Sequence, residues 1–124
     1  MHWIVDGMNV IGCRPDGWWR NRQHAMAALV DKLERWSVGA ATEVTVVFEQ
    51  PPKPPLRSMV ITVTHAPAAA PNSADDEIVR LVCSAEDPAA VRVATSDRAL
   101  ADRVRAAGAS VFPAEAMRSL VDPG

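Results

Sequence analysis

The sequence predicts an α/β protein, a three-layer helix-sheet-helix sandwich around a mainly parallel, Rossmann-like sheet of about five strands. Short apolar runs rich in β-branched residues recur along the 124 residues, and segments with apolar residues at helical spacing separate them. Strands joined through helices pair in parallel by right-handed crossovers, which places helices on both faces of the sheet. The length suits one compact core, so we expect residues 1–124 to form a single domain.

Several segments have the composition of buried strands. "EVTVVF", for example, is rich in β-branched residues that suit a pleated surface. The predicted strands cover Trp3–Val5, Glu43–Phe48, Met59–Thr64, Val91–Thr95 and Ala109–Phe112. The four prolines of "QPPKPPLR" (Gln50–Arg57) predict a stiff, extended connection between the second and third strands. A proline-rich ligand for a partner domain is the less favoured alternative.

Amphipathic segments between these runs are the predicted helices. The apolar face of the first consists of Met26, Leu29, Val30, Leu33 and Trp36. Gly39 is its expected end. A second helix is expected to begin near Ser73, whose hydroxyl would cap it in a capping box with Asp76. A third runs from Arg98 to a stop at Gly108, and the last covers Ala114–Val121.

Composition excludes some classes of protein. No apolar run approaches the roughly 18 to 20 residues of a membrane span, and no export signal is recognisable, so we expect a cytoplasmic protein without a membrane partner. Cys13 and Cys83 lie outside any CxxC pair and are expected to be thiols. The net charge of −2 does not favour a general polyanion-binding surface, so contact with nucleic acid would be local.

Acidic residues follow several of the predicted strands. Asp6 follows the first strand, Glu49 the second and Asp97 the fourth. Asp75 and Asp76 open the helix after the third strand. In an open parallel sheet, ligands bind beyond the carboxyl ends of the strands, near the point where the strand order reverses. We therefore expect these carboxylates to meet at one edge of the sheet.

A cluster of carboxylates favours a bound cation, because the alternative is mutual repulsion with raised pKa values. Oxygen-only ligation indicates Mg²⁺ or Mn²⁺ rather than zinc, and the histidines at positions 2, 24 and 65 have no ligand spacing. Such an ion polarises a phosphoryl oxygen and activates water, as phosphodiester hydrolysis requires. Asn9 is expected to orient a phosphate or a water through its amide.

Each acid also has a simpler interpretation. An Asp-Gly pair such as that of Asp6 is typical of a turn. Asp75 and Asp76 suit the start of a helix with or without a metal, and Asp97 suits a helix cap. Glu49 on its own is best interpreted as a solvated strand-end charge. Their shared location at one sheet edge favours a site, because the simpler view needs a separate reason for each acid.

The stretch "DGWWRNR" combines aromatic residues with arginines. Adjacent tryptophans cannot both face one core from a helix, so one of Trp18 and Trp19 is expected to be partly exposed. Aromatic residues beside arginines suit stacking on a base together with contact to a phosphate. The candidate substrate-binding residues here are Arg14, Trp18, Arg20 and Arg22. An aromatic lid over the helix start is an equally weighted alternative.

Four stretches, "WIVDGMNVIG", "VTVVFEQ", "SADDEIVRLV" and "VRVATSDRALADRVRAAGA", occur in this order along nearly the whole chain. Together they resemble the NYN domain of the PIN-like nuclease superfamily, in particular its YacP-like bacterial branch. The resemblance implies a PIN-like sandwich whose acidic pocket binds Mg²⁺ or Mn²⁺ and cleaves RNA. Matched by position, it implies metal ligation by Asp6, Asp75, Asp76 and Asp97, assisted by Asn9 and Ser96.

Together these observations predict a metal-dependent endoribonuclease whose partner is RNA, with the oligomeric state left open. The expected catalytic residues are Asp6, Asn9, Asp76 and Asp97, and Ser96 is expected to contact the substrate. The alternative is an RNA- or ribosome-binding module whose acidic pocket is not catalytic. A receiver domain lacks support because no second acid follows Asp6 in the first loop. A dinucleotide site lacks GxGxxG, and a DxD phosphatase is excluded by Met8.

Overall fold

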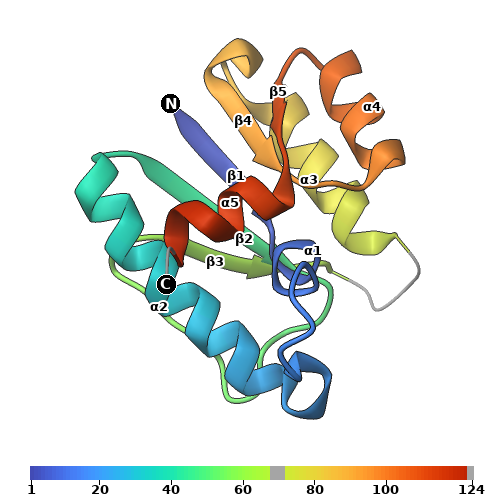
Figure 1. Ribbon diagram of the computed structural model, residues 1–124. Coiled ribbons are helices and arrows are strands. Elements are labelled where there is room, and N and C mark those ends of the chain that lie inside the picture. Colours follow the sequence, from blue (N-terminus) through green and yellow to red (C-terminus); the bar gives the residue numbers. More distant parts are fainter. Residues whose placement is uncertain (68–71, 123–124) are drawn as a thin grey trace.

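Five parallel strands form one sheet in the order β3-β2-β1-β4-β5 (Figure 1). The computed structural model describes residues 1–67 and 72–122. The strands are β1 (His2–Asp6), β2 (Glu43–Phe48), β3 (Thr62–His65), β4 (Val91–Ala94) and β5 (Ser110–Phe112). The predicted α/β class with a parallel sheet is confirmed.

The strand order reverses beside β1. The chain adds β2 and β3 on one side of β1 and then returns to place β4 and β5 on the other side. The crevice for a ligand in such a sheet lies beyond the carboxyl ends of the two strands at the reversal, here β1 and β4. Val5 pairs with Ala94 in the register of these strands, so Asp6 and Thr95 lie at the same level.

Helices cover both faces of the sheet (Figure 1). One face carries α1 (Gly7–Ile11), α2 (Arg22–Ala40) and α5 (Ala114–Val121), and the other carries α3 (Ser73–Ser84) and α4 (Arg98–Ala106). Two short 3-10 helices are η1 (Trp18–Arg20) and η2 (Pro88–Ala90). The strand alternation separates two cores, because Trp3 and Val5 pack with the first group of helices and Ile4 packs with the second.

Two predicted element boundaries are wrong. The third strand begins at Thr62 rather than Met59, because the Ser58 hydroxyl accepts the backbone N–H groups of Val60 and Ile61 and so takes them from a strand ladder. The first predicted helix continues through Gly39, and Ala41 ends it with a left-handed backbone (φ 50°).

Two helix starts also differ from prediction. Asn72, not Ser73, occupies the N-cap position of α3. The sequence pattern gave no sign of α1, which follows directly from β1. Gly7 allows this sharp entry, because a Cβ there would lie 2.6 Å from the buried Phe48 ring and 3.0 Å from the Val47 carbonyl oxygen. The glycine is therefore a requirement of close packing.

The described residues contain no helix that is both long and apolar enough to cross a membrane. Cys13 is half-buried and Cys83 is exposed, and both are free thiols as predicted.

Candidate active site

A cavity of about 300 Å³ opens at the carboxyl edge of the sheet. Four carboxylates from four parts of the fold line it: Asp6 ends β1, Glu49 follows β2, Asp75 lies in the first turn of α3, and Asp97 precedes α4. The other described lining residues are Met8, Asn9, Trp18, Arg22, Asn72 and Ala74. The cavity therefore lies where the strand order reverses, as expected for a ligand site in this fold.

Thr95 connects the two strands at the base of the cavity. Its hydroxyl donates to Asp6 Oδ2 at 2.9 Å and accepts the Asp97 backbone N–H at 3.2 Å. Asp97 Oδ1 in turn accepts the Leu100 N–H at 2.9 Å, which caps α4. Asp97 therefore caps α4, as the simpler interpretation of this residue expected. The same side chain also lines the cavity.

Burial and like charge raise two carboxyl pKa values here. The pKa of Asp6 rises to about 7, mainly because burial removes water from the carboxylate and further because Asp75, Asp97 and Glu49 repel its charge. The hydrogen bond from Thr95 acts in the opposite direction. The pKa of Asp75 is also raised, first by burial and then by Asp97. The described lining thus holds four carboxylates against one cation, Arg22, which leaves an excess of negative charge.

Asn9 and Ser96 form one polar unit beside the acids. The Ser96 N–H donates to Asn9 Oδ1 at 2.8 Å, and Ser96 Oγ accepts the Ala114 N–H at 2.9 Å. Its carbonyl oxygen accepts this bond, so the amide nitrogen is the side-chain group of Asn9 that remains to donate within the cavity that it lines. Ser96 is absent from the described lining of this cavity; it is exposed and lines a separate cavity of about 490 Å³ with Thr95 and Arg98, so its contact with a substrate stays a prediction.

Two of the candidate RNA-contacting residues reach the cavity. Trp18 and Arg22 both line it, and the Arg22 guanidinium lies over the Trp18 ring at 5.3 Å from the centroid. Trp18 is half-buried and contacts Trp19 edge-on, while Trp19 is 49% exposed, so the prediction that one tryptophan is exposed is confirmed. An aromatic face and a cation thus lie next to the carboxylates.

Three of the predicted site residues lie elsewhere. Asp76 points away from the cavity and pairs with Arg103 of α4 at 2.9 Å, because neighbouring positions on a helix differ by about 100° in direction. Arg14 pairs with Asp122 at 3.3 Å, and Arg20 lies over the Trp19 ring at 6.0 Å. None of the three belongs to the described lining, so the structure does not bring them to the cavity and their roles stay predictions.

Thr95, Asn72 and Glu49 are the residues that sequence reasoning missed or undervalued. Thr95 stands in the "TSD" stretch, but only its pairing level with Asp6 reveals the hydrogen bond. Asn72 lines the cavity from the start of α3, one residue before the predicted start of this helix. Glu49 is exposed, as expected of a strand-end charge, and it also lines the cavity.

The cavity lining offers the ligand atoms that a divalent cation prefers, although the carboxylates do not form a ready ligand group. Within residues 1–67 and 72–122, no three His, Cys, Asp or Glu side chains form a group able to hold a metal ion. The acids that line the cavity nonetheless offer only oxygen atoms, which fit Mg²⁺ or Mn²⁺ better than zinc. Their unneutralised charge favours a cation, and ligation requires the side chains to approach one another.

The parallel sheet with carboxylates at its strand reversal is a PIN-like α/β fold, and the family and structural matches assign it to a nuclease-type, RNA-related class. The family model described as the YacP-like NYN domain matches residues 3–123, and the chain belongs to this family.

Solved structures agree with this assignment. The crystal structure of Rae1 (YacP) from Bacillus subtilis is similar with a TM-score of 0.80 and 23% sequence identity, over 97% of this chain and 73% of that chain. A mutant of the same protein is similar with a TM-score of 0.77 and 25% identity, over 96% of this chain and 74% of that chain. No curated protein matches the sequence significantly.

Proposed function

We propose that the protein is a cytoplasmic, metal-dependent endoribonuclease that hydrolyses RNA phosphodiester bonds in the acidic cavity. The observation that carries the proposal is the convergence of Asp6, Glu49, Asp75 and Asp97 from separate elements on one cavity. Membership of the YacP-like NYN family supports the same class of activity. Trp18 and Arg22 at the rim supply the stacking surface and the cation that single-stranded RNA requires.

Asp6, Asp75 and Asp97 would hold Mg²⁺ or Mn²⁺, with Glu49 in place of the predicted Asp76 as the additional acid. When bound, the ion supplies positive charge that polarises the scissile phosphate and lowers the pKa of water.

The chain's own residues bind and orient the substrate. The Asn9 N–H groups donate to a non-bridging phosphate oxygen and stabilise the charge that develops on it. The Ser96 N–H fixes the Asn9 amide for this task, and the Thr95 hydroxyl fixes the Asp6 carboxylate. A base stacked on Trp18 holds the strand while Arg22 meets a phosphate.

Asp97→Asn tests the proposal. Asparagine caps helices as well as aspartate does, so α4 and the fold are expected to remain. Cleavage of single-stranded RNA with Mn²⁺ is expected to fall by at least about 10²-fold, the order of loss for a group that acts on transition-state charge. The matched control is Asp102→Asn on the same helix, where an exposed carboxylate lies 3.9 Å from Arg105 and outside the described cavity lining. Wild-type activity in the Asp97 variant would contradict the proposal.

The second candidate is an RNA- or ribosome-binding module without catalysis. The lack of a ready ligand group in the described part of the chain is the observation that favours it. Incubation of the wild-type protein with labelled RNA and Mg²⁺ or Mn²⁺ separates the two. RNA that is bound but stays intact with both ions would support the module.

A further inference from the structure

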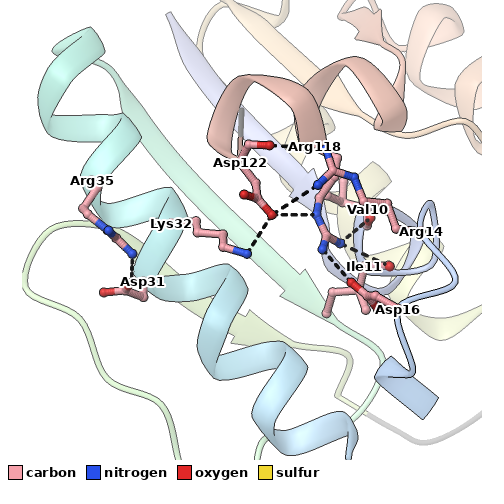
Figure 2. A network of polar contacts seen from close by, with 9 residues as sticks. All are labelled: Val10, Ile11, Arg14, Asp16, Asp31, Lys32, Arg35, Arg118 and Asp122. Carbon is pink, nitrogen blue, oxygen red and sulfur yellow. Dashed lines mark hydrogen bonds and ion pairs between the residues drawn. The ribbon is translucent and has the colours of Figure 1, made fainter. Parts of the chain in front are cut away.

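Arg118 of α5 is a buried arginine whose side chain is only 10% exposed. Figure 2 shows its guanidinium between α1, the segment before η1 and the end of α5. Nη1 donates to the carbonyl oxygens of Val10 at 3.5 Å and Ile11 at 3.3 Å, and Nη2 donates to Asp16 Oδ2 at 2.9 Å. One side chain therefore contacts two separate segments that both lead to the acidic cavity.

The first segment is α1, which carries Asn9. A helix of five residues leaves most of its carbonyl oxygens without partners inside the helix, and a cation at its C-terminal end is favoured by the helix dipole. Arg118 meets both needs at Val10 and Ile11. Besides its hydrogen bonds with the directly following Gly12 and Cys13, α1 has polar contacts to distant parts of the described chain through the Ser96 N–H on Asn9 and through Arg118 on its last carbonyls. Loss of the second would free Asn9 to move.

The second segment leads from Asp16 to Trp18. Gly17 between them has a left-handed backbone (φ 85°), which lets the chain turn sharply into η1. A cavity of about 250 Å³ lies between this segment, α2 and α5, with Trp18, Leu29 and Arg118 among the residues that line it. Because packing beneath the segment is incomplete, the Asp16–Arg118 contact has a large share in holding Trp18 at the cavity rim.

The side-chain hydrogen bonds of Arg118 go to these segments and not to the residues of α5 or its C-cap. Asp122 Oδ2 lies 3.7 Å from Arg118 Nε, beyond hydrogen-bond distance, and Nε has no hydrogen-bond partner among the residues that the structure describes. Asp122 instead bonds Lys32 at 2.9 Å and Arg14 at 3.3 Å (Figure 2). Only the planar fork of an arginine reaches α1 and Asp16 together, since a lysine has a single charged nitrogen.

We propose that Arg118 is a positioning residue of the active site, which holds Asn9 through α1 and Trp18 through Asp16. The proposal rests on the proposed nuclease function for its kinetic consequences. It predicts two separate effects of Arg118. The contact with α1 affects the rate of cleavage, and the contact with Asp16 affects the binding of RNA.

Three variants test this separation in the full chain. Arg118→Lys keeps the charge and loses the fork, so kcat is expected to fall by about 10- to 100-fold and KM for RNA to rise. Asp16→Asn weakens only the contact with the segment before η1, so KM is expected to rise about two- to fivefold with kcat unchanged. Asp31→Asn is the matched control, because it breaks the exposed pair with Arg35 drawn in the same view and is expected to change neither constant.

A purely structural role for Arg118 would lower the active fraction and leave KM unchanged in both variants, and that result would overturn the proposal. Hydrogen–deuterium exchange gives a readout that does not depend on cleavage. Residues 7–11 and 16–20 are expected to exchange faster in Arg118→Lys, and only residues 16–20 in Asp16→Asn. If the wild type cuts no RNA, the nuclease proposal fails while exchange still decides the role of Arg118. Unchanged exchange of residues 7–11 in Arg118→Lys would overturn it.

Discussion

The acidic cavity and the cluster around Arg118 both gather charged side chains, yet they treat charge in opposite ways. In the cavity, four carboxylates belong to one lining, and the pKa of Asp6 rises to about 7 through burial and the neighbouring acids. In the cluster, Asp122 lies among Lys32, Arg14 and Arg118, and its pKa is lowered, first by the hydrogen bond from Lys32. The acids of the cavity repel one another, whereas each carboxylate of the second cluster is paired with at least one cation.

This difference distinguishes a ligand-binding site, the acidic cavity, from a structural contact, the cluster around Arg118. Paired charges with well-formed contacts hold segments in place, whereas unpaired like charges destabilise the fold and persist where a ligand uses them. The two regions are adjacent in function, because Arg118 holds the segments that carry Asn9 and Trp18 into the cavity. The paired charges around Arg118 thus help to hold the residues that line the acidic cavity.

Removal of the buried acid is the strongest way to test this contrast. The raised pKa means that folded Asp6 binds its proton more tightly than the unfolded chain does, so stability falls as pH rises from about 4 to about 7. The Asp6→Asn variant has no carboxyl group to ionise there and does not lose stability in this way as the pH rises. In chelator at pH 8 the variant is expected to be more stable than wild type by about 2 to 4 kcal/mol, with a difference that shrinks towards pH 4. Urea unfolding at several pH values measures this, and a pH-independent difference would contradict the contrast.

A divalent cation should relieve the repulsion without mutation. Mn²⁺ at about 100 times its Kd is expected to stabilise the wild type by about 2.7 kcal/mol, with a larger effect at pH 8 than at pH 5 because a protonated Asp6 competes with the ion. Thermal unfolding with and without Mn²⁺ measures the shift. Asp97→Asn serves as the control and should show a smaller shift; an equal shift in both proteins would place the ion outside the cavity.

Removal of the Asp122 carboxylate, which is paired with cations, should change the free energy of unfolding in the opposite direction and by the smallest amount. Asp122→Asn is expected to destabilise the protein at pH 7, but only modestly because the side chain is 24% exposed and solvent screens it. The lowered pKa means that this stabilisation is present above about pH 4 and is lost as pH falls through the folded pKa. Unfolding at pH 7 and pH 3 measures it. A stabilised Asp122 variant at pH 7 would show that the cluster is not balanced.

The sequence predicted the edge of the sheet at which the acids gather, because local patterns suffice for that. Alternating apolar runs and amphipathic helices define parallel strands, and the carboxyl ends of parallel strands share one edge. Asp6 and Asp97 stand directly at such ends, and the structure places both in the cavity lining. Their presence there follows from the order of the elements alone.

The choice between Asp75 and Asp76 could not be predicted in the same way. Both suit the first turn of a helix, and which one faces the cavity depends on how α3 is rotated on the sheet. That rotation is set by packing against β1 and β2 and by the pairing of Asp76 with Arg103 on α4. The short helix α1 was equally hidden, since five residues are too few for a periodic pattern to show.

By itself, then, the sequence determined the α/β class, the parallel sheet and the edge that carries the acids, because propensity and periodicity act over a few neighbouring residues. Tertiary structure alone decided that Thr95 bonds Asp6 and that Arg118 reaches α1 and Asp16. Those contacts join residues about 90 to 108 positions apart. They form only after β1 and β4 have paired in the sheet and α5 has packed beside α1. Burial then makes each unpaired polar group costly.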